Sequence, residues 1–560
     1  MSNTTSASQP VNAAKREAPI QRAQEADELL TSVKDLITNF IRSADQDASS
    51  QASGHGLQVP GGGPRSVLVE HHAPKKLESL LSLSLPDQGL GHEGFLSFTK
   101  ELLQYSVNTW DQGFLAKLYA STTPVGLAAD LLLSALNTNV HVYSVSPALT
   151  LVEKRTSRAL AALYGWEGPH AGGVSQPGGS AANLSAVVIA RNNLFPETKT
   201  DGNGTHRFVL FTSAHGHYSL EKAAQMLGLG ARAARSVAVD EQGAMRPDAL
   251  KAAVQAAKEA GETPFFVNAT AGTTVLGAYD PLDAIASVCE EFGLWLHVDG
   301  SWGGPAIFSD THKAKLAGSA RADSLTVSPH KMLGVPVTCS FLLGKDLRRF
   351  HKGMSLPAAY LFHDNDDQTD SAARGLAAAH ITDPSPADSL STPPDPSTNE
   401  SPPPNAQDIY DLADLVPQCG RRGDSLKLAL TWLAIGRSGL ADYVDTAFAR
   451  ASELADLVSR HEELRLASTN PPPCLQVCFY YSRGGPEGAK GKKEWNDRVT
   501  EQIAKRLVPR GFMTDYAPGD EGKFLRVVVN GQTRRETLEG LVRAVVESGE
   551  EVVKGLEEGK

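Results

Sequence analysis

Apolar and polar residues follow two alternating rhythms between residues 127 and 345. Short apolar runs are typical of buried strands, whereas longer stretches with an apolar residue every three or four positions are typical of amphipathic helices. This alternation predicts a large α/β domain over residues 127–345, built on a mostly parallel sheet. The predicted strands are Arg207–Thr212, Pro264–Asn268, Leu294–Asp299, Ser324–Val327 and Cys339–Leu343, with helical stretches such as Arg246–Ala260 and Pro281–Phe292 between them.

The pattern changes after residue 420. Two helical stretches, Asp424–Ala434 and Leu440–His461, come first. They are followed by predicted strands near Leu475–Tyr481 and Phe524–Asn530 and by a terminal helix, Thr533–Val546. Residues 420–560 are therefore predicted to form a small α+β C-terminal domain.

Two of the remaining segments, 1–66 and 346–419, are poorer in apolar residues. Residues 1–66 are rich in Ser, Ala, Gln and Gly and are predicted to be largely disordered, apart from one amphipathic helix near residues 24–42. Residues 67–126 form an N-terminal segment. Residues 346–419 are predicted to hold a mobile loop and a disordered insertion, 366–407, where Asp, Pro, Ser and Thr dominate and cannot build a core.

Length and charge restrict the class of protein. At 560 residues the chain suits two domains plus tails. A net charge of −11 and a pI of about 5.8 argue against a nucleic-acid partner. The N-terminus has no apolar signal core and no apolar run is long enough to span a bilayer, so we expect a cytoplasmic enzyme without a membrane partner. The five cysteines show no disulfide framework, and no metal site is expected.

Two charged residues follow predicted strands and point to one chemistry. Asp299 closes the apolar run Leu294–Asp299, and Lys331 lies on a turn after the next strand, behind Ser-Pro-His. An enzyme that uses pyridoxal phosphate (PLP) needs such a pair. The Lys forms a Schiff base with the cofactor, and the carboxylate keeps the pyridine nitrogen protonated. The apolar neighbours of Lys331 should depress its pKa and make it nucleophilic at neutral pH.

Three runs around these residues, Asn268–Asp280, Leu296–Gly304 and Ser328–Pro336, resemble those of the PLP-dependent group II amino-acid decarboxylases. The likeness is closest to the glutamate and cysteine sulfinate branch and extends from about Phe95 to about Val546. It implies PLP as cofactor and a fold-type I, aspartate aminotransferase-like large domain. It also implies a homodimer.

The resemblance also implies roles for individual residues around the cofactor. In the run Val174–Asn183, glycines before a predicted helix allow close backbone approach, so Gly179 and Ser180 would hold the phosphate. His217 would lie flat on the cofactor ring as a catalytic residue. The other implied cofactor contacts are Thr270 beside the ring, His330 near the phosphate, and Ser301, which replaces a small apolar residue common in the family.

Three further residues are matched to the substrate. Tyr360, in Ala358–His363, corresponds to the family's loop Tyr that protonates the substrate Cα after loss of carbon dioxide. Arg526 corresponds to the residue that binds the α-carboxylate. Lys117 stands where members acting on acidic substrates carry a Gln. A Lys there either pairs with a distal carboxylate or sulfinate or indicates a different substrate.

The resemblance therefore implies α-decarboxylation of an L-amino acid to the amine and carbon dioxide, with glutamate, cysteine sulfinate or aspartate favoured. One alternative keeps PLP but acts on an aromatic amino acid, or releases an aldehyde by oxidative deamination. Another is a non-catalytic relative. The presence together of His217, Asp299, Lys331, Tyr360 and Arg526 argues against that second alternative.

Overall fold

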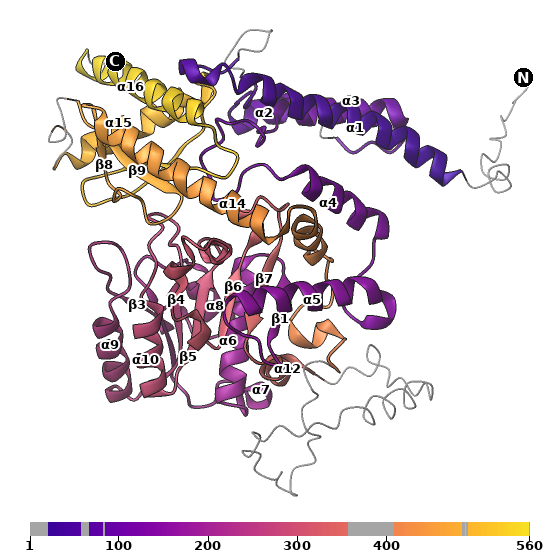
Figure 1. The fold of residues 1–560 in the computed structure, drawn as a ribbon, viewed down its shortest axis with the longest axis vertical. Helices are drawn as coiled ribbons and strands as arrows, with labels where there is room; N and C mark the ends of the chain where they lie inside the picture. The colour runs from indigo at the N-terminus through magenta and orange to yellow at the C-terminus, as the bar shows by residue number, and fades with distance from the viewer. Residues whose placement is uncertain are drawn as a thin grey trace, which may run out of the picture.

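The computed structural model describes residues 21–57, 66–81, 84–356, 408–483, 488 and 491–558. Within these residues the strands form two sheets, a seven-stranded and a four-stranded one. The long helix α14 (Ser425–Arg460) runs between the two sheets, and the N-terminal helices lie beside the smaller one (Figure 1). No helix in this part of the chain is long and apolar enough to cross a membrane.

The larger sheet has the strand order β1-β7-β6-β5-β4-β2-β3. The five strands from β6 to β3 are parallel, and β7 is antiparallel to both of its neighbours. A mostly parallel sheet, as predicted, is confirmed. Its strands are β1 Gly172–Gln176, β2 Phe208–Ser213, β3 Ala234–Val237, β4 Thr263–Thr270, β5 Trp295–Gly300, β6 Ser324–Val327 and β7 Ser340–Gly344.

Helices cover both faces of this sheet, which explains why its central strands are mostly apolar and buried. Side chains alternate along β2, so Leu210 and Phe211 enter two different cores. Leu210 packs with residues of α6 (Gly179–Leu194), α8 (Ser219–Met226) and α12 (Leu347–Met354). On the opposite face, Phe211 packs with residues of α9 (Pro247–Glu259) and α10 (Leu282–Phe292).

The smaller sheet is antiparallel, with the order β10-β11-β9-β8. Its strands are β8 Leu464–Leu466, β9 Gln476–Tyr481, β10 Asp515–Ala517 and β11 Phe524–Val528. Besides α14, helices α15 (Lys493–Leu507) and α16 (Arg535–Glu557) pack on it. The two helices predicted after residue 420 are the two halves of α14, which breaks at Gly436, where φ is 71°.

The predicted N-terminal amphipathic helix corresponds to α1 (Arg22–Asp47), which packs on α3 (Gly91–Tyr105). The expected disorder after it is wrong for residues 44–57. Asp47 and Gln51 are fully buried there, and Gln51 Nε2 donates to Asp111 Oδ1. Composition misleads at this point because the partners of Gln51 Nε2, Asp111 and the Gly511 carbonyl, are far away in the sequence. The other helices are α2 Pro74–Leu80, α4 Pro124–Leu136, α5 Pro147–Leu163, α7 Thr198–Asp201 and α11 Pro329–Met332.

Candidate active site

A cavity of about 220 Å³ lies at the carboxyl ends of the central parallel strands, where open α/β sheets bind their ligands. Strands β4 and β5 end there, and the chain after β6 enters the short helix α11, which carries Lys331. Helix α6 begins at the same edge. The residues that line the cavity are Gly179, Ser180, Asn183, His217, Tyr218, Thr270, Gly272, Thr274, Asp299, Ser301, Trp302 and Lys331.

Asp299 is held as a carboxylate. Burial alone would raise its pKa, but hydrogen bonds from Ser301 and Asn183 and the charge of Lys331 outweigh burial, and the pKa of Asp299 lies below its usual value. The Ser301 backbone N–H donates to Asp299 Oδ1 at 3.0 Å, and Asn183 Nδ2 donates to Oδ2 at 2.8 Å. A buried carboxylate at this place can hold a cationic ring nitrogen.

The Asn183 amide is itself oriented by His297. Burial lowers the pKa of His297 to about 4, so its ring is neutral and carries a single proton. Nε2 lies 3.1 Å from Asn183 Oδ1, which can only accept, so Nε2 carries the proton and Nδ1 accepts from Ser324 Oγ at 2.8 Å. Trp295 Nε1 donates to the same Ser324 oxygen. This chain of hydrogen bonds runs in one direction and ends on Asp299.

Lys331, His217 and Asp299 line the same cavity, and the charge of Asp299 raises the pKa values of Lys331 and His217. Burial is the larger effect in each case and lowers the two pKa values below normal. The backbone N–H of Ser219 donates to His217 Nδ1 at 3.2 Å, which leaves the proton of a neutral ring on Nε2. Both groups are thus biased toward the neutral form.

The residues present fit a phosphorylated pyridine. Helix α6 begins at Gly179, after Gly178 with φ of 111°, and offers free N–H groups to a phosphate. A Cβ at Gly179 would lie 2.5 Å from Ser301 Oγ, so a larger residue would crowd the cradle. Thr270 Oγ1 and Ser301 Oγ are buried in the wall and have no hydrogen-bond partner among the described residues, as expected of groups meant for a ligand.

His330 and Lys117 do not line this cavity. His330 Nδ1 lies 2.8 Å from the backbone oxygen of Cys339. Burial lowers the pKa of His330 to about 4. A phosphate contact of His330 stays a prediction. Lys117 is half exposed and pairs with Asp515 at 2.8 Å. Tyr360 lies outside the described residues.

Arg526 approaches the cavity through Thr274, a wall residue. Its Nη1 donates to Thr274 O at 3.0 Å, and Nη2 donates to Asp515 Oδ2 at 3.0 Å. The same Asp515 oxygen pairs with Lys117, so two cations share one carboxylate. Arg526 Nε is buried and has no partner among the described residues. This cluster therefore keeps a net positive charge beside the cavity.

Sequence reasoning missed Asn183, Trp302 and Gln476. Asn183 lies one turn after Gly179 in the run that was matched to the phosphate loop, and that spacing puts both on one face of α6. Gln476, on β9, accepts from Trp302 Nε1 at 2.9 Å and donates to the Thr273 and Thr274 carbonyls at 2.9 and 3.1 Å. No local signal identified Gln476, because its partners lie in another part of the chain.

An α/β fold with a buried Asp and Lys at the ends of its central strands defines a fold-type I PLP-dependent enzyme, and comparison with known proteins specifies the family. The pyridoxal-dependent decarboxylase conserved domain matches residues 74–378. The L-aspartate decarboxylase dtxS4 of Metarhizium robertsii is 45% identical over 535 residues, covering 95% of this chain and 99% of that protein. The protein belongs to the pyridoxal-dependent decarboxylase family, and its cofactor is PLP.

Other relatives agree with this family. Human cysteine sulfinic acid decarboxylase is 37% identical over 479 residues, covering 82% of this chain and 87% of that protein. The crystal structure of mouse CSAD superimposes with a TM-score of 0.77 at 31% identity, covering 95% of this chain and 99% of that one. The expected family, fold type and cofactor are confirmed. The enzyme is an amino-acid decarboxylase.

Proposed function

We propose that the enzyme decarboxylates an acidic L-amino acid to the amine and carbon dioxide, with aspartate as the first candidate and glutamate and cysteine sulfinate next. The observation that carries the proposal is the likeness to relatives named for aspartate and cysteine sulfinate. In the Arg526–Asp515–Lys117 cluster beside the cavity, two cations share one carboxylate, and the one net positive charge suits the substrate α-carboxylate.

Each residue has a task that its surroundings support. Lys331, whose pKa is lowered by burial, would hold the cofactor through its amino group. When bound, PLP accepts the electron pair that is left as carbon dioxide departs. Asp299 keeps the pyridine nitrogen protonated, and the hydrogen bonds from Asn183 and Ser301 keep Asp299 ionised. Gly179 and Ser180 bind the phosphate at the start of α6, with His330 assigned to the same region.

The remaining assignments concern the ring and the substrate. His217 would hold the ring, and Thr270 and Ser301, whose hydroxyls have no partner among the described residues, would also contact it. Arg526 orients the α-carboxylate through Nε, while Lys117 neutralises Asp515 and so preserves the charge of Arg526. Tyr360 protonates the substrate Cα. Protonation there rather than on the cofactor gives an amine and leaves the cofactor ready for another turnover.

The enzyme is further proposed to act as a homodimer. Helix α4 exposes Leu127, Leu131, Leu132 and Leu136, each more than a third accessible. Contiguous apolar surface of this kind is typical of an obligate interface. Light scattering after gel filtration should give twice the mass of the 59.5 kDa chain. Leu131→Asp/Leu132→Asp should shift that mass toward the monomer, and an unchanged dimer would exclude α4 from the interface.

The substrate is tested on the PLP-loaded full chain. Aspartate, glutamate, cysteine sulfinate, phenylalanine and tyrosine are each supplied, and carbon dioxide and amine are measured, with Lys331→Ala as the control. Release from an acidic substrate that disappears in the control supports the proposal. Release only from aromatic substrates, or an aldehyde in place of the amine, would contradict it. Cofactor absorbance is recorded separately, so that failure to load PLP is not mistaken for the wrong substrate.

A further inference from the structure

A second cavity, of about 360 Å³, lies between α5 and the segment 409–415. Gly172 and Gly173 of β1, the edge strand of the larger sheet, form part of its wall. It shares no lining residue with the cofactor cavity. Its volume is in the range of small-molecule sites.

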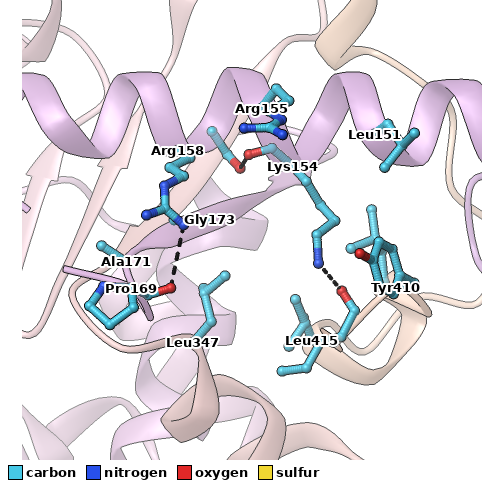
Figure 2. Close-up of a pocket in the computed structure, with 14 residues that line it drawn as sticks. Leu151, Lys154, Arg155, Arg158, Pro169, Ala171, Gly173, Leu347, Tyr410 and Leu415 are labelled. Carbon is cyan, nitrogen blue, oxygen red and sulfur yellow. Dashed lines mark hydrogen bonds between the residues drawn. The ribbon is translucent and has the colours of Figure 1, made fainter. Parts of the chain in front are cut away.

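Three cationic side chains of α5 line this cavity: Lys154, Arg155 and Arg158 (Figure 2). None of the described lining residues carries a carboxylate. Arg155 is exposed and forms no ion pair within the described residues, and Arg158 Nη1 makes one long contact, 3.4 Å to Pro169 O. The protein as a whole has a net charge of −11, so a concave surface with an excess of positive charge is unusual for it.

Lys154 already interacts with Ile409 and Tyr410, which form the cavity wall that faces α5. Its Nζ donates to Ile409 O and lies 4.2 Å from the centroid of the Tyr410 ring, and Asp408 is the acidic group that attracts it. Lys154 and Arg158 extend from α5 toward opposite walls of the cavity (Figure 2). The two arginines are therefore the groups with donors to spare.

The rest of the wall is apolar. The aromatic ring of Tyr410 and the side chains of Leu151, Leu347, Ile409, Leu412 and Leu415 complete the cavity. Such a surface buries a hydrocarbon or aromatic body, while the guanidinium forks of Arg155 and Arg158 match the paired oxygens of a carboxylate or phosphate. A simple inorganic ion would leave the apolar part of the wall unused.

We propose that this cavity binds a small organic oxyanion, a carboxylate or phosphate group carried on an apolar or aromatic body. Arg155 and Arg158 bind the oxyanion, and the leucines and Tyr410 surround the body. The site is independent of the decarboxylase reaction because the two cavities have separate walls.

Calorimetric titration of the PLP-loaded full chain tests the proposal. Phenyl phosphate and phenylacetate separate the two oxyanions, and inorganic phosphate serves as the head group without a body. We expect at least one aromatic anion to bind with a Kd on the order of 0.1–1 mM, and more tightly than inorganic phosphate. Arg155→Glu/Arg158→Glu should weaken that binding by about ten- to a hundredfold, and Arg158→Lys should weaken it less.

The matched control is Arg498→Glu/Lys505→Glu on α15, which makes the same change of charge on an exposed helix elsewhere. It should leave the affinity unchanged, and circular dichroism checks that both double variants are folded. Equal loss in the two double variants, or no binding of either aromatic anion, would overturn the proposal. Binding that appears only when residues 366–400 are deleted would also overturn it, because the chain's own acidic segment would then be the occupant.

Discussion

Two aspartates are almost equally buried in this enzyme, yet they are held in opposite states of charge. Asp299, in the cofactor cavity, is 5% exposed and its pKa lies below the usual value. Asp111 lies beside Asp47 and Gln51 at the end of α1, and these three residues are called the junction below. Asp111 is 3% exposed and its pKa is raised to about 8. Burial by itself therefore does not decide whether a carboxyl group is ionised.

The neighbours of the two groups explain the difference. Asp299 receives hydrogen bonds from Ser301 and Asn183 and faces Lys331, so donors and a cation surround it. Asp111 accepts from Gln51 and from the Gly113 N–H, but the carboxylate of Asp47 lies beside it and its Oδ2 has no partner among the described residues. Hydrogen-bond donors and a cation keep Asp299 ionised, whereas burial and the neighbouring Asp47 carboxylate raise the pKa of Asp111.

The largest effect is expected from Asp299→Asn, which removes the charge and keeps the shape. A neutral side chain cannot hold a protonated ring nitrogen, so kcat should fall on the order of 100-fold or more. Cofactor absorbance and thermal stability are measured with kcat to show that PLP still binds and the fold survives. A variant that retained near-normal kcat would remove Asp299 from the mechanism.

A smaller effect on kcat should follow when a second carboxyl group is placed beside Asp299, as Asp47 lies beside Asp111. Asn183→Asp replaces a donor to Asp299 with a second carboxyl group, so the two groups share a proton and the pKa of Asp299 rises. We expect kcat to fall by roughly 10- to 100-fold at neutral pH. Because a raised pKa leaves Asp299 neutral at low pH, the ratio of variant to wild-type kcat should increase as the pH rises.

Asn183→Ala is the matched control for that experiment. It removes the same hydrogen bond without adding a carboxyl group, so the pKa of Asp299 should rise less, and the loss of kcat should be smaller and depend less steeply on pH. Identical pH profiles for the two variants would show that the hydrogen bond alone matters, and would contradict the shared proton.

These two regions also differ in how well the sequence predicted them. Asp299 and Lys331 follow apolar strands, and parallel strands bring their carboxyl ends to one edge, so periodicity placed both residues in one cavity. Strands β1 and β3 were missed because Gly-Gly-Val-Ser-Gln and Ala-Arg-Ser-Val are not apolar runs, although β1 is fully buried. Their pairing in the sheet overrides the weak local preference.

The junction could not be predicted, because its partners are distant in the sequence and polar. Gln51 belongs to a stretch of Ser, Ala and Gln whose composition indicated disorder, yet it contacts Asp111, 60 residues away, and Gly511. The same limit applied to Lys117 and Arg526, whose common partner Asp515 appears only in the folded chain. Long-range polar pairs leave no periodic signal.

The junction itself is tested by Asp111→Asn. The folded pKa of about 8 lies above the ordinary 3.8, so the folded protein holds one proton more than the unfolded chain between these values. The stability that this proton brings at low pH is lost as the pH rises toward 8. An amide imitates the protonated carboxyl group, so the variant should gain about 1–3 kcal/mol over wild type at pH 8 and little at pH 4.

Urea denaturation at pH 4, 6 and 8 measures this difference, with Asp27→Asn as the control, since Asp27 is exposed on the same helix α1 that ends at Asp47. The control should follow wild type at each pH. A gain in stability for Asp111→Asn that is the same at pH 4 and pH 8 would show that the pKa of Asp111 is not raised in the folded protein.

The smallest effect is expected where a buried polar group is satisfied by neutral partners. Gln476 bonds Trp302 and two backbone carbonyls and so fixes two segments of the cavity wall to β9 without any charge. Gln476→Ala should raise KM roughly three- to tenfold through the lost hydrogen bonds, with a smaller change in kcat. Because no titrating group is added or removed, the shape of the pH profile should stay that of wild type.

Gln112→Ala is the control, since Gln112 also bonds backbone groups but lies outside the cavity wall. An altered pH profile in Gln476→Ala would mean that this neutral network helps to set the charge of Asp299. Gln476 could then no longer be treated as a buried polar group without influence on ionisation.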